Sequence, residues 1–327
     1  MSTYNSLARG GSSCSTKQLS NQTARLQRPS SICRGVETRS IWNIAKGFGI
    51  SFAPKVLNDR PELKPGKISP KLLVPAHIGR PPYADSGVLP PWSAKNQLHN
   101  AEGIVKLRAA GKLAAEVLNY AGTLIKAGVT TDSIDRAVHA MIIERGAYPL
   151  AFELRKVPQE PVHLGERGDI LNVDITVFLN GYHGDTSRMY TVGQVAPEAQ
   201  ALCDVTKEAL DAAIKLCGPG VAYNVIGKSI QVVADKHKYG VVRDYVGHGV
   251  GQTFHSGPTI RHNRNNDAGV MQLYQSFTIE PMLVQGSIKC NTWDDDWTVV
   301  TKDRGLCAQY EHTLLITPNG VEVMTQL

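Results

Sequence analysis

The stretch from Asn172 to Arg188, NVDITVFLNGYHGDTSR, places the strongest constraint on how this chain can fold. Two runs of residues that favour β-strands flank Asn180-Gly181, and this dipeptide between alternating apolar positions predicts a two-residue hairpin turn. A turn at that point fixes the cross-strand pairs Leu179–Tyr182, Val177–Gly184 and Thr176–Asp185. The pairing decides which side chains share a face of the sheet.

The hairpin brings two carboxylates onto one face. Side chains alternate along a strand, so Asp174 lies on the same side as Thr176 and becomes a diagonal cross-strand neighbour of Asp185, about 7–8 Å away at the backbone. Converging carboxylates repel each other unless a cation lies between them, and hard divalent cations often have this role. A surface hairpin with two solvated aspartates is the alternative, and the hairpin alone leaves both interpretations open.

Three further polar groups lie downstream in apolar or glycine-rich surroundings. His248 follows Gly247 in a stretch that lacks the lysine and helix start of a phosphate-binding loop, which predicts an exposed, glycine-flanked histidine. Glu280 and Glu311 each interrupt an apolar strand pattern. Taken singly, a hydrogen-bonded histidine and two glutamates on solvated strand faces would be ordinary. Both glutamates lie where burial is expected, however, and an unpaired buried carboxylate is costly.

Together these residues form a set of potential metal ligands. Four carboxylates and one imidazole suit a pair of Mn, Co, Fe or Zn ions better than a thiolate zinc site. The set is Asp174, Asp185, His248, Glu280 and Glu311. No two of the six cysteines lie close together in sequence, which argues against a zinc finger or a disulfide framework.

The order of elements predicts an α/β fold built from two similar halves. Apolar residues recur at helical spacing from Asn100, with Asn100 as cap and Gly128 as stop, and again over 132–145 with Thr131 as cap. The second half repeats the order with helices over 197–216 and 222–238. Strands are expected at Tyr245 and over 276–284, 298–301 and 309–317. Two halves of the order helix, helix, strand indicate an internal duplication with a site between them.

The excess positive charge of this chain is confined to its beginning. The net charge is +6, and residues 1–46 hold seven basic residues and one acid, so the remainder carries 28 of each sign. The 1–46 segment is rich in serine, threonine and arginine and lacks the apolar core of a secretory signal. It therefore predicts a disordered transit peptide for the mitochondrion or the chloroplast, with a basic disordered tail as the alternative. The neutral remainder gives no reason to expect nucleic-acid binding.

Residues 47–96 are expected to form an extension rather than a domain. Nine prolines between 54 and 91 prevent a long helix or a central strand there. We expect a linker along the domain surface, or less plausibly a proline-rich partner motif, followed by a catalytic domain over 97–327. The sequence contains no apolar run of the ~18 residues that a membrane span needs.

Five motifs, in order and spacing, closely resemble those of type I methionine aminopeptidases. They are Val173-Asp174-Ile175-Thr176, Gly181-Tyr182-His183-Gly184-Asp185-Thr186, Gly247-His248-Gly249, Thr278-Ile279-Glu280-Pro281-Met282 and Gln309-Tyr310-Glu311-His312-Thr313. The likeness runs from about Ala101 to the C-terminus, and the leader looks like those of organellar members. It implies the pita-bread fold, with two pseudo-symmetric halves around a dinuclear metal site. It also implies monomers that act on the N-termini of nascent polypeptides.

The resemblance also implies residue roles. Asp174 would bind one divalent ion, His248 and Glu280 the other, and Asp185 and Glu311 would bridge the two. Glu280 would also shuttle the proton. In addition, His255 would contact the substrate amide, and Phe254 and Trp297 would line a tight methionine pocket that admits only a small second residue.

One segment departs from the family pattern. After Gly146-Ala147-Tyr148-Pro149 the family continues with pocket residues and a Cys-His-Gly segment, whereas this chain has the shorter 150–167, LAFELRKVPQEPVHLGER. The pocket tyrosine and cysteine and a histidine that stabilises the scissile amide are missing, and His163 is not in the matching context. Losing one such hydrogen bond typically lowers the rate ~10²–10³-fold. Two readings therefore stand: an initiator-methionine aminopeptidase of full or reduced activity, or an inactive relative that binds peptides or partners. A proline-specific or creatinase-like relative is a weaker third.

We hypothesise that this chain is a splice or gene-model variant that lacks a segment. Sequencing full-length transcripts is expected to reveal a message with a longer segment after Pro149. If every message encodes 150–167 as written, the hypothesis fails.

Overall fold

The computed structural model describes residues 70, 72–150, 168–292 and 299–327. All of them belong to the contact unit Lys55–Leu327. The predicted leader, residues 151–167 of the departing segment 150–167, and Trp297 lie outside the described residues.

Four helices and fourteen strands make up the described part of the chain. The helices are α1 (Ala101–Leu124), α2 (Thr131–Glu144), α3 (Pro197–Ile214) and α4 (Asn224–His237). The strands are β1 (Ser93–Asn96), β2 (Tyr148–Pro149), β3 (Asp169–Leu179), β4 (Tyr182–Val192), β5 (Gly240–Val241), β6 (Gly247–Gly249), β7 (Ser256–Ile260), β8 (Ser276–Ile279), β9 (Met282–Val284), β10 (Cys290–Thr292), β11 (Val299–Thr301), β12 (Cys307–Gln309), β13 (Glu311–Thr317) and β14 (Gly320–Val323). The predicted order of helix, helix, strand is present twice.

The β3–β4 hairpin has the register that the sequence predicts. Thr176 pairs with Asp185, Val177 with Gly184 and Leu179 with Tyr182. Asn180 and Gly181 have φ values of 53° and 85°, as a turn of the type preferred by Asn-Gly requires. The hairpin therefore fixes which residues of β3 and β4 share a face.

The helix termini follow local hydrogen bonding. The Asn100 side chain accepts a hydrogen bond from the Gly103 N–H, so the predicted cap of α1 is confirmed. The cap of α2 is Thr130, whose side chain accepts from the Ser133 N–H, and not Thr131 as predicted. Either threonine could cap, and only the extended backbone of Thr130 places its hydroxyl over the first turn.

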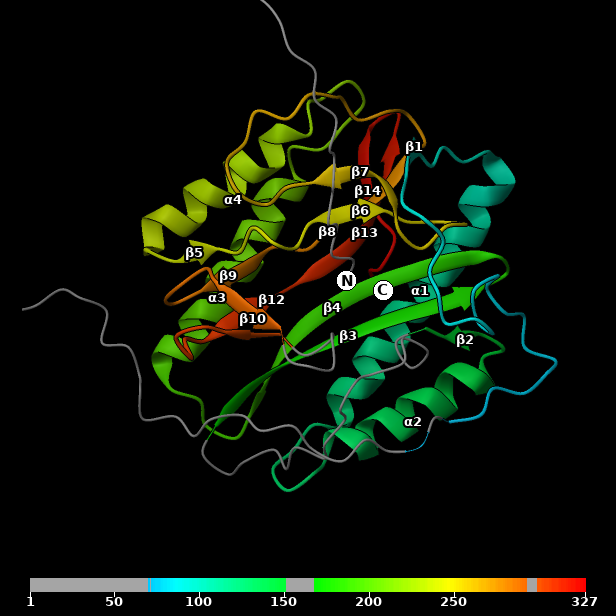
Figure 1. Ribbon diagram of the computed structural model, residues 1–327, viewed down its shortest axis with the longest axis horizontal. Helices are drawn as coiled ribbons and strands as arrows, with labels where there is room; N and C mark the ends of the chain where they lie inside the picture. Colours follow the sequence, from blue (N-terminus) through cyan, green and yellow to red (C-terminus); the bar gives the residue numbers. More distant parts are fainter. Residues whose placement is uncertain (1–69, 71, 151–167, 293–298) are drawn as a thin grey trace, which may run out of the picture. The chain divides into compact units, whose positions relative to one another are not determined.

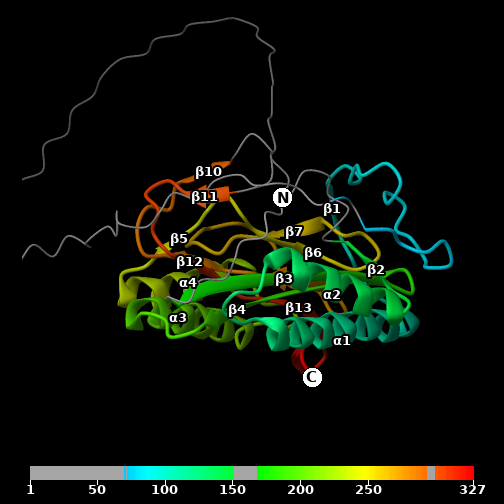
Figure 2. The same cartoon turned by 90° about the horizontal axis from the view of Figure 1, so that it is seen from below.

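The four helices lie on one side of the central sheet. This sheet joins the strands in the order β14-β13-β4-β3-β2, with β8 also paired to β13. Figure 1 shows the long β3–β4 hairpin crossing α1, and Figure 2 shows α1 to α4 in one layer below the strands, with β6, β7, β10 and β11 on the other side. Apolar clusters fill the space between helices and sheet, and the shorter strands cover the opposite face of the sheet.

Two long strands predicted from the sequence are interrupted in the structure. The run 276–284 divides into β8 and β9 around Glu280 and Pro281, and 309–317 divides into β12 and β13 around Tyr310. Proline has no N–H to donate to a ladder, which accounts for the first break. The predicted strand at Tyr245 is absent, and its neighbours form β5 and β6 instead. Each break lies beside one of the predicted ligand glutamates.

The described part of the proline-rich extension packs onto the domain. Ile78, Tyr83 and Ala84 are buried with Tyr148, Leu150, Phe178 and Phe254 in one apolar cluster. Strand β1 runs parallel to β7, with Ser93 opposite Ser256. The extension therefore contributes both a strand and buried side chains to the fold.

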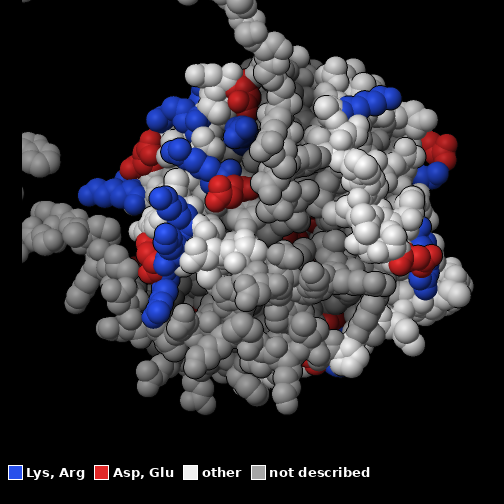
Figure 3. All heavy atoms as spheres, in the orientation of Figure 1, with Lys and Arg blue, Asp and Glu red and all other residues white. Residues whose placement is uncertain are grey.

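Charges on the surface of the described residues are mixed. Figure 3 shows lysine and arginine side chains gathered toward the side of α4 and β11, with acidic side chains between them. Arg261 pairs with Asp267 at 2.8 Å and Arg264 with Asp235 at 3.2 Å. Among the described helices, none combines the length and apolar character that crossing a bilayer demands.

We expect Gly181→Ala to lower the free energy of unfolding by ~1 kcal/mol or more, because an L side chain is strained at φ 85°. A Cβ at this position would meet nothing within 4 Å, so conformation alone determines the loss. Urea denaturation measures it. The matched control is Gly79→Ala, where a Cβ also meets nothing and the backbone is not left-handed. Equal losses in the two variants would contradict the explanation.

Candidate metal centre

Three of the predicted ligands converge in one buried place. Asp185, His248 and Glu311 each offer a ligand atom, and these atoms all lie within 4.8 Å of one another. The exposed fractions of these residues are 4, 7 and 2%. The structure thus contradicts the expectation that His248 is exposed, because Gly247 and Gly249 let the β6 backbone pack closely against Thr278 and Gly257.

Different sheets supply these groups. Asp185 lies on β4, whose Ser187 pairs with Glu311 at the start of β13. His248 lies on β6, and its backbone N–H donates to the Thr278 hydroxyl of β8 at 3.1 Å. Residues far apart in sequence therefore meet because β13 pairs with both β4 and β8.

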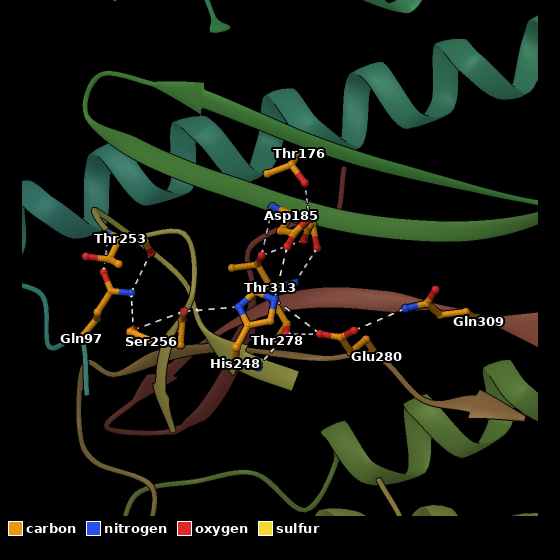
Figure 4. A network of polar contacts seen from close by, with 12 residues as sticks. Gln97, Thr176, Asp185, His248, Thr253, Ser256, Thr278, Glu280, Gln309 and Thr313 are labelled. Atoms are coloured by element: carbon orange, nitrogen blue, oxygen red, sulfur yellow. Dashed lines mark hydrogen bonds and ion pairs between the residues drawn. The ribbon is translucent and has the colours of Figure 1, made fainter. Parts of the chain in front are cut away.

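Glu280 faces the same centre from the break after β8. Its Oε1 lies 3.5 Å from His248 Nε2, and Asp185 Oδ2 lies 3.7 Å from the same nitrogen. Figure 4 shows the imidazole between the two carboxylates. Glu280 thus joins the cluster through His248.

Asp174 lies at the edge of the cluster. It is opposite Ser187 in the hairpin, two positions from Thr176, so it shares a face with Asp185 as predicted. Its side chain is exposed, unlike the other three carboxylates. Loss of hydration and the Asp185 charge both raise the pKa of Asp174, and the charge is the more important of the two because the side chain retains access to water.

Threonine hydroxyls orient the carboxylates, a feature that the sequence analysis did not identify. Thr176 donates to Asp185 Oδ1 at 2.6 Å, and Thr278 donates to Glu280 Oε1 at 2.8 Å. Thr313 accepts from the Asp185 N–H and donates to its carbonyl oxygen. The signal was present in the sequence as a threonine two residues from each of Asp174, Glu280 and Glu311.

Crowding of carboxylates raises their proton affinity. Burial raises the pKa of Asp185 to about 6, against the hydrogen bond from Thr176, which lowers it. Burial, and then the Asp185 charge, raise the pKa values of Glu280 and Glu311 well above their usual range. Without a cation, these acids keep their protons to a higher pH than ordinary carboxyl groups do.

The histidines of the cluster are neutral. Burial lowers the pKa of His248 to about 4, and burial followed by the His248 charge lowers the pKa of His255 well below its usual value. The rings of His248 and His255 lie 4.3 Å apart, and Phe254 stacks on His255 at 3.9 Å. His262, another residue that the sequence analysis missed, accepts the Glu280 N–H through Nε2 at 3.0 Å. A neutral imidazole is the form that binds metals.

This donor set fits divalent cations. Within the described part of the chain, the hydrogen-bond and ion-pair partners of Asp185, Glu280 and Glu311 include no lysine or arginine. Buried carboxylates without such partners need another source of positive charge. Oxygen donors with one imidazole suit Mn, Fe, Co or Zn.

Comparisons with known proteins agree with this chemistry. Residues 105–318 match the model of metallopeptidase family M24. The chain is 54% identical over 281 residues to methionine aminopeptidase 1D, chloroplastic/mitochondrial, of Arabidopsis thaliana, an alignment that covers 82% of this chain and 80% of the relative. A crystal structure of methionine aminopeptidase from Rickettsia prowazekii has a TM-score of 0.68 and 38% identity, covering 71% of this chain and all of that one.

The chain belongs to metallopeptidase family M24. Within that family it resembles the organellar methionine aminopeptidases, as the sequence predicts. The expected α/β pita-bread fold is confirmed. Prolidase from Pyrococcus furiosus, at 20% identity and a TM-score of 0.56, shares the fold alone.

We expect the acids of the cluster to stabilise the metal-free protein less as the pH rises from 5 to 8. Buried histidines with lowered pKa values change the stability in the opposite sense. The share of the acids is therefore measured as the difference between the wild type and a variant that lacks two of them, Asp185→Asn with Glu311→Gln. The folded-state pKa of Asp185, about 6, exceeds its usual 3.8, and those of Glu280 and Glu311 are also raised. The folded state binds these protons more tightly than the unfolded state does. The protonated acids therefore stabilise the fold fully below their pKa in the unfolded state, and this contribution is lost as the pH rises through their pKa in the folded state. The Asp185 shift of about two pKa units corresponds to roughly 3 kcal/mol of unfolding free energy over the whole pH range between the two pKa values. Urea denaturation with a chelator measures the slope.

Added Mn²⁺ should reverse this slope, because cations bind the deprotonated ligands. The reference is Asp185→Asn with Glu311→Gln in the metal-free state, which keeps the histidines and loses the two acids. A difference in stability between wild type and variant that does not shift against the wild type from pH 5 to 8 would contradict the assignment.

Proposed function

We propose that this chain removes the initiator methionine from proteins whose second residue is small. The observation that carries the proposal is the convergence of buried carboxylates with His248, beside His255, in a chain of the M24 family. Two relatives, 54% and 50% identical to this chain, carry the name methionine aminopeptidase. This favours the aminopeptidase over the alternative of an inactive peptide-binding or partner-binding module.

We infer that two divalent ions bind here. Asp174 would hold one ion, His248 and Glu280 the other, with Asp185 and Glu311 between them. The pKa pattern supports this, since each carboxylate would exchange a proton for a cation. Such ions lower the pKa of water and polarise a peptide carbonyl.

The chain's own residues orient the substrate and move the proton. Glu280, held by Thr278 on Oε1 and by Gln309 on Oε2 at 3.5 Å, would accept a proton on its carboxylate and deliver it to the leaving amine. His255, stacked on Phe254, would donate to the oxygen of the scissile amide from its imidazole. Phe254 would form part of the methionine pocket. Trp297, the other expected pocket residue, lies outside the described residues.

All of the altered segment 150–167 except Leu150 also lies outside the described residues, so its effect on activity stays a prediction. A pocket that lacks part of its wall would hold methionine less tightly, and substrate positioning would be poorer. Turnover reduced by ~10²–10³-fold is the expected consequence of one lost transition-state hydrogen bond.

The location and partners follow the same reasoning. The relative in Arabidopsis thaliana is named chloroplastic/mitochondrial, and the acid-poor leader supports import into an organelle. N-termini of polypeptides newly made or imported there are the proposed substrates. A monomer remains the expected form.

We expect the full chain, loaded with Mn²⁺ or Co²⁺, to release methionine from a Met-Ala-Ser peptide and not from Met-Leu-Ser. Glu280→Gln should lower the rate by at least ~10²-fold, because the amide cannot move the proton. Measuring free methionine over time provides the rates. The matched control is Glu144→Gln, an exposed glutamate on α2, which should keep the wild-type rate.

Absence of methionine release by a folded, metal-loaded protein would favour the binding-module alternative. Equal rates for Glu280→Gln and Glu144→Gln would refute the role given to Glu280.

A further inference from the structure

The loop 250–255 carries two of the proposed substrate-contacting residues, and its position depends on residues outside the metal ligands. Phe254 and His255 stack with ring centroids 3.9 Å apart, and His255 lies against the ring of His248. The loop follows β6 without a helix of its own. Something must hold its backbone, because ordering a loop has a substantial entropic cost.

Two sets of hydrogen bonds hold this loop, and we call each set a clamp. The first is formed by His183, a residue of β4 that is fully buried. Both its backbone N–H, at 2.8 Å, and its ring Nδ1, at 2.6 Å, contact the carbonyl oxygen of Gly251. The other ring nitrogen, Nε2, lies 2.6 Å from the hydroxyl of Tyr83. Tyr83 comes from the extension that precedes α1 and is itself 6% exposed.

These contacts determine the tautomer of His183. A carbonyl oxygen only accepts hydrogen bonds, so Nδ1 must carry the proton. The ring lies among Tyr83, Phe178 and Phe254, an apolar setting that disfavours an imidazolium without a carboxylate partner. Nε2 is therefore the acceptor, and the Tyr83 hydroxyl donates to it. The Tyr83 hydroxyl thus stabilises the tautomer whose Nδ1–H donates to the Gly251 carbonyl oxygen.

A second clamp comes from Gln97, the residue that directly follows the extension and its strand β1. Its Nε2 donates to the Thr253 carbonyl oxygen at 2.9 Å, and its Oε1 accepts from the Thr253 N–H at 3.0 Å. Figure 4 shows this pair of bonds, together with the bond from Gln97 to Ser256. A Cβ on Gly251 would lie 2.8 Å from Gln97 Oε1 and 2.7 Å from a ring carbon of His99, so the loop packs tightly against the residues that join the extension to α1.

The two clamps act on either side of one short segment. Gly251 is held through His183, and Thr253 is held by Gln97. The ring of His183 also stacks on Phe254, with centroids 5.4 Å apart. The next residue, His255, has no such contact with the extension among its described partners, so its place follows from that of its neighbours.

We propose that Tyr83 and Gln97 are positioning residues, which act through His183 and the 251–253 backbone to place Phe254 and His255 for the reaction. The extension before α1 is then part of the active site's support rather than a linker. This inference rests on the proposed aminopeptidase function for its kinetic consequence. The tautomer of His183 does not depend on that function.

The test compares the full wild-type chain with Tyr83→Phe, which removes only the hydroxyl. We expect kcat/KM for Met-Ala-Ser to fall about tenfold, the factor that one ordinary hydrogen bond represents, with a change in both kcat and KM. Gln97→Glu, which keeps the acceptor and loses the donor to Thr253, should have a similar effect. The matched control is Tyr274→Phe, whose side chain is 40% exposed, and it should behave as wild type.

A spectroscopic measurement accompanies the kinetics. Two-bond ¹H–¹⁵N spectra of histidine-labelled protein report the tautomer of each imidazole, and a His183→Asn variant identifies the signal of His183. We expect the Nδ1–H pattern in the wild type and a shifted Nε2 resonance in Tyr83→Phe. A merely structural role would lower the unfolding temperature without changing kcat or KM of the folded enzyme.

The outcomes separate the two proposals. Wild-type values of kcat and KM in folded Tyr83→Phe, or an Nε2–H pattern for His183, would overturn the positioning role. If the wild type releases no methionine, the proposed function fails. In that case the ¹⁵N spectra still test the hydrogen bonds of His183. The expected tautomer and the shift in Tyr83→Phe would support them, and the absence of either would refute them.

Discussion

Mutual repulsion of buried carboxylates is the constraint on which the rest of this structure depends. Asp185 and Glu311 are almost wholly buried beside Glu280, with raised pKa values and His248 among them. An arrangement of this kind persists only when the surrounding fold holds it rigidly and a cation offsets the repulsion. The hairpin, the strand breaks and the threonines can all be understood as parts of that support.

Much of the fold was predictable because it depends on local chemistry. Asn180-Gly181 admits the positive φ values of a tight turn, so the register of β3 and β4 follows from two residues. Asn100 caps α1 for a similarly local reason. Thr130 and Thr131 could each cap α2 with a hydroxyl, so local chemistry does not determine which of them is the cap. The prediction of Thr131 was therefore wrong by one residue.

The site was predictable in its composition and not in its packing. Resemblance identified the residues that converge, and the shared face of Asp174 and Asp185 follows from strand alternation. The burial of His248 could not be inferred, since it depends on how closely the backbones of Gly257 in β7 and Thr278 in β8 pack against the two glycines that flank it. The position of the extension was equally hidden. Prolines exclude a helix or a central strand, yet they do not exclude a short parallel strand such as β1 or a buried tyrosine such as Tyr83.

The cost of the cluster also bears on the choice between an enzyme and a binding module. A surface that only captured peptides would gain stability by replacing buried acids with apolar side chains of similar size. Here, instead, Thr176 and Thr278 orient carboxylates whose pKa values burial raises above their usual range. Hydroxyls that fix the direction of a carboxylate matter when its oxygens must meet a partner of defined geometry. Metal-dependent hydrolysis requires that geometry, and simple peptide capture does not.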